Sequence, residues 1–261
     1  MNAQLLEALQ QVSVIEAQPC SRKISYESSR SIVQPVLPLL VFVAVALALF
    51  AGRAIAHDVS DVDRALIVGK PGLQPTLYLW LGAKHMVTGY DHLLFLVGVV
   101  FYLRRIREIA IFVTLFALGH SISLIGGVLL GLHVNPYLVD AIIGLSVAYK
   151  GFDNLGGFKN LFGEAPDEHV AVFVFGLFHG LGLATKLQDL GLRPDGLVGN
   201  LVAFNVGVEL GQFAALLVIV LLLRLFAWDH NNRYARVIVN GGLVVAGFAL
   251  MTYQLAQYLS G

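Results

Sequence analysis

Residues 77–103 read LYLWLGAKHMVTGYDHLLFLVGVVFYL, an apolar stretch long enough to cross the roughly 30 Å hydrocarbon core of a membrane as a helix. Within it stand His85, Asp91 and His92, and ionisable side chains at such a depth are costly. They usually face a bundle interior or a water-filled path along which ions or protons move. Imidazole and carboxylate are also ligands that suit divalent transition metals. The stretch therefore predicts a membrane helix that carries part of an ion site.

The spacing of these residues decides how they can act together. In an unbroken helix His85 and His92 share one face but lie about two turns, or ~10 Å, apart. One ion could contact both side chains only if the helix were broken. We therefore expect Asp91 and His92 to form the centre of the site, with His85 as an approach position on the same face.

The composition of the whole chain agrees with a membrane protein. Of 261 residues, 57% are hydrophobic and 13% are charged, whereas a soluble domain carries about 25% charged residues. We expect an all-α, polytopic bundle of transmembrane helices in a lipid bilayer. The net charge is zero and no basic cluster is present, which argues against nucleic-acid binding. Cys20 is the single cysteine, so a metal bound by this chain would be held by nitrogen and oxygen ligands.

The first 56 residues have the features of a secretory signal. Positive residues precede the apolar run 36–52, and an A-x-A site follows at residues 54–56. Because the positive region is unusually long, a cleaved signal peptide and an uncleaved anchor both remain open. Either alternative places the segment 57–75 outside the cytoplasm. Cleavage would make His57 the N-terminal residue, on an entry path for a metal ion.

Six apolar stretches follow and form a predicted transmembrane domain over residues 76–258. Each has about the length that a helix needs to span a bilayer. The predicted spans are 76–103, 109–131, 136–154, 170–190, 199–226 and 235–258. Arg104, Arg105 and Arg107 lie near the first connection, so the positive-inside rule makes the odd-numbered loops cytoplasmic. We expect an integral protein of a bacterial inner membrane with an extracytoplasmic mature N-terminus, and a homo-oligomer remains open.

Ionisable residues of four predicted helices fall at about the same depth. His92, His120, His179 and Glu209 each lie near the middle of their span. Scattered core histidines would not be expected to align in this way, so the alignment predicts one site near the bilayer midplane, where transporter sites commonly lie. For a single histidine, the alternative is a hydrogen bond to a neighbouring helix. Asp140, near the outer end of the third span, is a candidate for the entry path.

The chain resembles the HupE/UreJ family in four features. They are the pattern H-x5-D-H-L at residues 85–93, the sequence FHG at residues 178–180, an A-x-A-His start and six spans. The resemblance covers roughly residues 57–258. Members of this family are regarded as secondary nickel or cobalt permeases, often linked to the metal supply of hydrogenase or urease. The resemblance implies that the histidines and the aspartate of the first pattern take part in metal passage.

The chain departs from the family in the second motif, which there continues to another histidine and a glutamate. Here those two places hold Leu183 and Lys186. A cation in place of an acid argues against an identical nickel site, and Glu209 could replace the missing carboxylate. We expect Lys186 to lie near the outer interface and to extend its ammonium group into it.

These observations predict membrane transport of a divalent transition-metal ion, with nickel or cobalt favoured by the resemblance and copper or zinc compatible with the same ligands. The predicted metal residues are His85, Asp91, His92, His120, His179 and Glu209. Neither an organic cofactor nor an enzymatic activity is expected. The alternative is an intramembrane zinc-dependent hydrolase, in which the same cluster would activate a zinc-bound water. Haem binding by two mid-membrane histidines is a third interpretation.

Overall fold

The computed structural model describes residues 65–67, 72–102, 105–189, 194–225 and 233–260. These ranges consist of helices and short connections, and no strand occurs in them. The all-α class expected from composition is therefore confirmed for the described part of the chain. The signal peptide or anchor predicted in residues 1–56, and His57, lie outside the described residues.

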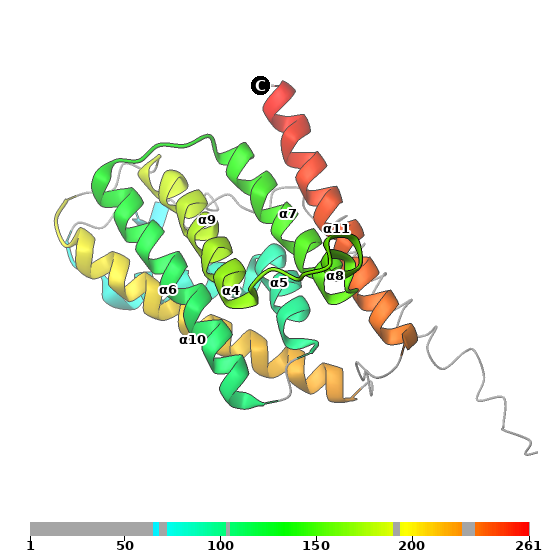
Figure 1. The fold of residues 1–261 in the computed structure, drawn as a ribbon. Helices are drawn as coiled ribbons and strands as arrows, with labels where there is room; N and C mark the ends of the chain where they lie inside the picture. The colour runs from blue at the N-terminus through cyan, green and yellow to red at the C-terminus, as the bar shows by residue number, and fades with distance from the viewer. Residues whose placement is uncertain (1–64, 68–71, 103–104, 190–193, 226–232, 261) are drawn as a thin grey trace, which may run out of the picture. The chain divides into compact units, whose positions relative to one another are not determined.

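The helices follow the predicted spans closely. In chain order they are α4 (Pro75–Thr88), α5 (Tyr90–Val100), α6 (Ile106–Leu130), α7 (Pro136–Asn154), α8 (Gly157–Phe162), α9 (Glu168–Gln188), α10 (Leu197–Leu225) and α11 (Arg233–Ser260). Figure 1 shows the ribbon with these labels. Two features differ from expectation: the span predicted over 76–103 is divided into α4 and α5, and the short helix α8 precedes α9.

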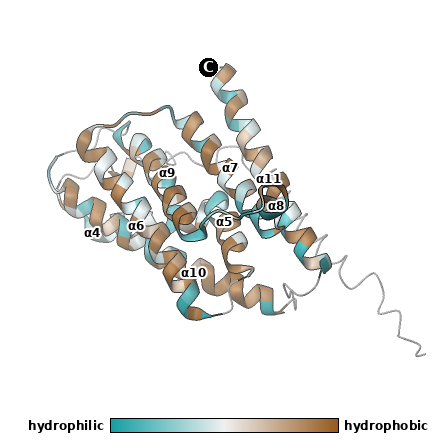
Figure 2. Ribbon diagram, in the orientation of Figure 1, coloured by the Kyte–Doolittle hydropathy of each residue, from teal (hydrophilic) through white to brown (hydrophobic). Residues whose placement is uncertain are grey.

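Four of the described helices, α6, α9, α10 and α11, are long and apolar enough to cross a membrane. Figure 2 shows the hydrophobic colour along most of α6 and α10. Helix α7 is also 19 residues long, but it carries the charged residues Asp140, Lys150 and Asp153. Helix α5 is apolar but has only 11 residues, so a first span would require α4 and α5 together. Six spans therefore remain a prediction that goes beyond these four helices.

Side chains near the helix starts explain where two of the helices begin. Oδ1 of Asn135 accepts hydrogen bonds from the amides of Tyr137 and Leu138 at the start of α7, and Pro136 occupies the first helical position. Asp167 caps α9 in the same way. Such caps satisfy amides that have no partner within the helix. Local sequence therefore sets these two boundaries.

Glycines allow three pairs of helices to pack very closely. Helix α4 packs on α10, α6 on α9, and α7 on α11. A methyl group at Gly82 of α4 would meet the backbone of Phe204, and one at Gly207 of α10 would meet the backbone of Leu79. Small residues at helix contacts are typical of membrane proteins, in which association depends on close packing.

The order of the glycine contacts gives the relative direction of each pair. Helices α4 and α10 run in the same direction, as do α6 and α9, whereas α7 and α11 run in opposite directions. The contacts that define these directions are Gly207–Leu79 and Gly211–Ala83, Gly119–Phe173 and Gly127–Ala184, and Gly144–Met251 and Gly151–Asn240. These directions are those required if the six predicted spans cross the bilayer alternately, with α4 and α5 together as the first.

We expect Gly180→Ala to weaken the contact between α6 and α9. A methyl group at Gly180 would meet the carbonyl oxygen of His120 and Oγ of Ser123, so the helices would have to move apart. Overpacking of this kind costs about 1–3 kcal/mol, and the midpoint temperature of thermal unfolding should fall. Gly126→Ala on α6 is the matched control, because a methyl group there meets nothing within 4 Å. Equal midpoints for the two variants would contradict this explanation of the packing.

Candidate metal centre

The helical path of residues 75–100 is interrupted at Gly89. Helix α4 ends at Thr88 and α5 begins at Tyr90, while Gly89 between them is extended, with φ −73° and ψ 99°. The amide of Gly89 still donates a hydrogen bond to the carbonyl oxygen of His85, with an N···O distance of 2.9 Å. The chain therefore leaves one helix and enters the next within a single residue.

The interruption places His85 beside His92. Their ring centroids lie 5.1 Å apart, because the extended residue breaks the regular helical rotation that would separate them by two turns. The expectation that His85 occupies a separate approach position is thereby corrected. A methyl group at Gly89 would lie 2.5 Å from Nδ1 of His92, so the imidazole of His92 can lie this close to residue 89 only when that residue is glycine.

The interruption also brings two helix ends to the site. His85 lies in the last turn of α4, and Asp91 lies in the first turn of α5. The C-terminal end of a helix carries a partial negative charge that favours cations, and the N-terminal end stabilises a carboxylate. Discontinuous helices form substrate and ion sites in many transporters by the same means.

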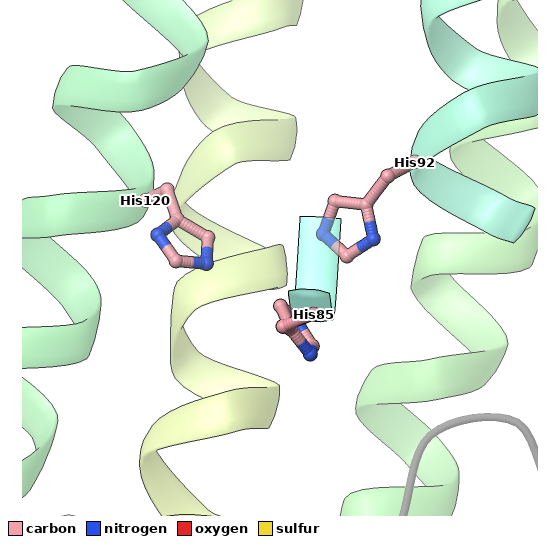
Figure 3. Close-up of side chains that lie close together, drawn as sticks. All are labelled: His85, His92 and His120. Carbon is pink, nitrogen blue, oxygen red and sulfur yellow. The ribbon is translucent and has the colours of Figure 1, made fainter. Parts of the chain in front are cut away.

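Four helices bring histidine and aspartate side chains together in two overlapping groups. The first group is His85 from α4, His92 from α5 and His120 from α6. The second group is Asp91 and His92 from α5 with His179 from α9. In each group, one possible ligand atom per residue lies within 4.8 Å of the others. Figure 3 shows His92 and His120 extending toward one another, with His85 beside them. We call the five residues the metal centre, and His92 is the member common to both groups.

The metal centre is buried and bordered by aromatic rings. Asp91 and the histidines of α5, α6 and α9 are at most 2% exposed, and His85 is partly buried. The ring of Phe116 lies 4.9 Å from that of His179 and 6.2 Å from that of His92, measured between centroids. A hydrophobic border of this kind limits the access of water and thereby strengthens electrostatic interactions inside the site.

Each of the three buried histidines directs Nδ1 toward an oxygen that can only accept a hydrogen bond. When these bonds form, Nδ1 carries the proton and Nε2 is the nitrogen with the lone pair. The acceptors are Oδ1 of Asp91 for His92 at 3.0 Å, the carbonyl oxygen of Phe175 for His179 at 2.7 Å, and Oδ1 of Asn205 for His120 at 3.4 Å. Metal-ligating histidines almost always donate their other ring N–H in this way.

The amide of Asn205 is itself held in place. Its Nδ2 donates to the carbonyl oxygen of Leu201 at 2.9 Å, and Oγ of Ser121 donates to its Oδ1 at 2.9 Å. This arrangement turns the oxygen toward His120. Among the described residues, Nε2 of His120 and Nε2 of His179 have no hydrogen-bond partner, although both are buried. The centre can therefore offer neutral imidazole nitrogens to a divalent cation.

The structure does not bring every predicted residue to this centre. Glu209 is exposed on α10 and belongs to neither group, so it does not replace the missing family carboxylate in this arrangement. Asp140 also lies outside both groups, and its Oδ2 is 2.8 Å from Nζ of Lys186. The expectation that Lys186 extends into the interface is corrected, because its side chain is only 13% exposed and pairs with Asp140.

The sequence of residues 61–260 matches the family model described as HupE / UreJ protein. The chain belongs to the HupE/UreJ family. The HupE/UreJ family is associated with nickel and cobalt transport, and the four long apolar helices agree with an integral membrane protein. No curated protein and no solved structure gives a significant match to the chain. The resemblance expected from the H-x5-D-H pattern is thus confirmed for most of the chain's length.

Proposed function

We propose that this HupE/UreJ family member carries a divalent transition-metal ion across the membrane, and that the ion pauses at the metal centre. The observation that supports this most strongly is the hydrogen bonding of His92, His120 and His179, whose Nδ1 atoms all meet acceptors. A histidine that only joins two helices has no need to present a buried Nε2 as well. These imidazoles, from three helices, belong to two groups that share His92, and such nitrogens are suited to a divalent metal.

The proposed ligand set differs from the one predicted from sequence. His85 joins His92 and His120 as a ligand, because the break at Gly89 brings it within reach. Asp91 orients His92 and contributes negative charge to the centre. Glu209 is left out of the proposed set.

The proposed path crosses the membrane along the helix bundle. The proposed direction is uptake: the ion would enter from the extracytoplasmic side, past the segment 57–75 and Asp140, and would leave toward the cytoplasm. The positive-inside rule places Asp140 toward the extracytoplasmic side. The six-span topology of this proposal agrees with the directions of the three glycine-mediated helix pairs. A bacterial inner membrane is the proposed location.

Nickel or cobalt is the proposed cargo, since the family is associated with these metals. Imidazole and carboxylate would also accept copper or zinc, because selectivity depends on geometry and on metal supply as well as on affinity. The test is uptake of each of the four metals by cells that produce the protein, compared with cells that produce His92→Ala. We expect only the cargo metal to accumulate, and only with the unchanged protein. Equal accumulation in both cell lines for every metal would contradict the proposal.

We expect Asp91→Asn to weaken metal binding by about 10–100-fold, as is typical when the partner of a metal-ligating histidine is altered. Asparagine can still accept the hydrogen bond from His92, but the negative charge is lost. The dissociation constant of the purified protein for nickel or cobalt is the quantity to measure. An unchanged dissociation constant would show that the carboxylate charge does not act on the ion.

A further inference from the structure

Two ion pairs join α7 and α9, and neither belongs to the metal centre. At one end of the contact, Nζ of Lys186 on α9 lies 2.8 Å from Oδ2 of Asp140 on α7. At the other end, Nζ of Lys150 on α7 lies 3.4 Å from Oε1 of Glu168 on α9, and 3.2 Å from Oδ2 of Asp153 in its own helix. The polarity is therefore reversed between the two ends: α7 supplies the acid at the first and the base at the second.

Stability alone is a weak reason for these pairs. Asp140, Lys150 and Lys186 are largely buried, and Glu168 is the most exposed member. Removing two charges from water costs about as much as their attraction returns, so a buried pair is often no more stable than an apolar contact. Ionisable residues within membrane helices more often mark a route for ions. Such a pair can separate and form again when water reaches both charges as it opens, because hydration then replaces the attraction between them.

Along α9, the metal centre lies between the two pairs. His179 follows Glu168 by eleven residues and precedes Lys186 by seven, which corresponds to about 16 Å and about 10 Å along the helix axis. On α7, the partners Asp140 and Lys150 are about 15 Å apart by the same rise per residue. An ion that moved along this contact in either direction would meet one pair before the centre and the other after it.

The Asp140 end lies close to the centre along α9, because Gly182, which is packed against Asp140, follows His179 by three residues. Oδ1 of Asp140 is buried and has no hydrogen-bond partner among the described residues. A methyl group at Gly182 of α9 would lie 3.6 Å from that oxygen, at ordinary van der Waals contact. The carboxylate of this pair therefore lies against α9 within one turn of His179.

The helix packing indicates which parts could move. Helix α7 is tightly packed on α11, and α9 on α6, through glycine contacts. The histidines of the metal centre come from α4, α5, α6 and α9, and none comes from α7 or α11. A small tilt of the α7–α11 pair against α9 would therefore separate an ion pair at one end. The C-terminal end of α5 is joined to α7, because Nδ2 of Asn154 donates to the carbonyl oxygen of Gly98 at 2.7 Å, so we expect this end of α5 to move with α7.

We propose that the Asp140–Lys186 pair and the Lys150–Glu168 pair are the two gates of the transport path and that they open alternately. This inference rests on the proposed transport function. In one state the Asp140 gate is open and the Lys150 gate is closed, and in the other state the reverse holds. Movement of one group of helices against another around a fixed central site is the usual means of alternating access in secondary transporters.

The test measures, from each side of the membrane, the accessibility of a position between the gates. Ser146 of α7 lies between the two pairs and is 1% exposed, and cysteine is close to serine in size. The reporter is Ser146→Cys in a chain whose single native cysteine is replaced, Cys20→Ser. Membrane vesicles of both orientations are treated with an impermeant maleimide, and the rate of labelling is measured.

Each gate is neutralised without a large change in side-chain size. One variant combines Asp140→Asn with Lys186→Met. The other combines Lys150→Met with Glu168→Gln and Asp153→Asn, because Asp153 also pairs with Lys150. We expect each variant to raise the labelling rate about fivefold or more, and the two increases should occur from opposite faces of the membrane. A fivefold change is the lower end of the usual coupling between two sites in a protein. A third variant, Arg105→Gln with Glu108→Gln, removes an exposed pair at 3.8 Å and should leave both rates unchanged.

Labelling that does not rise in either gate variant, or that rises from the same face in both, would overturn the inference. Metal binding by the purified Lys150 gate variant separates this failure from a failure of the proposed function. That variant should bind nickel or cobalt within about twofold of the unchanged protein, because its residues belong to neither group of the metal centre and do not lie on the proposed entry path. If the unchanged protein bound no metal, the proposed function would fail, whatever the labelling showed.

Discussion

The variant His92→Ala is expected to lose nickel or cobalt binding, with the dissociation constant rising by more than about 100-fold. Changing only the partner of a metal-ligating histidine costs about 10–100-fold, and removal of a ligand should cost more. His92 is the one residue that both groups of the metal centre share, so its loss leaves neither group with three ligands. Isothermal titration of the purified protein with the metal measures this effect.

His133→Ala is the matched control for this variant. His133 lies between α6 and α7, its side chain is 57% exposed, and it pairs with Asp189 rather than with the metal centre. The same change of residue type should therefore leave the dissociation constant within about twofold of the unchanged protein. If the two variants weakened binding equally, the metal would not be bound at the centre proposed here.

The second large effect is expected for Gly89→Ala, which should weaken metal binding by about tenfold or more. The backbone angles of Gly89 are accessible to alanine, so the effect does not arise from backbone strain. It arises because the added methyl group would lie 2.5 Å from Nδ1 of His92 and 3.1 Å from Oδ1 of Asp91. The imidazole and the carboxylate must then move, and ligand orientation is lost.

Gly241→Ala provides the comparison for Gly89→Ala. Gly241 lies within α11, and a methyl group there meets nothing within 4 Å. Helix content measured by circular dichroism should be unchanged in both variants, and metal affinity should fall only for Gly89→Ala. Equal affinity of the two variants would mean that the interruption between α4 and α5 does not position the ligands.

The helices could be predicted from the sequence because bilayer thickness and hydropathy limit their length. The third span was predicted over residues 136–154, and α7 occupies the same residues. Helix α5 could not be separated from α4 in this way, because apolar residues lie on both sides of Gly89 and the chain contains 27 glycines. Only the contact of Gly89 with the His92 ring distinguishes it from glycines that serve helix packing.

Depth along each helix could also be predicted, but rotation about the helix axis could not. His92, His120 and His179 were predicted at one depth, and their rings do come together, with the centroid of His92 6.5 Å from that of His120 and 4.9 Å from that of His179. Glu209 was expected at the same depth, yet it is exposed, while Asn205 one turn earlier supports His120. Asn205, Glu209 and Gln212 are spaced at i, i+4 and i+7 and so fall within about 60° of one face of α10, and this spacing does not tell which of them turns inward.

The structure also explains the lysine that departs from the second family motif. At the place where the family has a glutamate, Lys186 pairs with Asp140 of another helix. The charge of Lys186 is therefore directed to the contact between α7 and α9, and it lies outside both metal-binding groups. Such a partner on a distant helix cannot be inferred from one motif, because it depends on which helices are neighbours.

Metal flux through the purified protein in sealed liposomes tests the transport proposal most directly. Radioactive nickel or cobalt is supplied outside, and the amount retained inside is followed over time for the unchanged protein and for His92→Ala. We predict saturable uptake by the unchanged protein and uptake at the level of protein-free liposomes for the variant. Uptake by the variant equal to that of the unchanged protein, or no uptake by either above protein-free liposomes, would contradict transport through the metal centre.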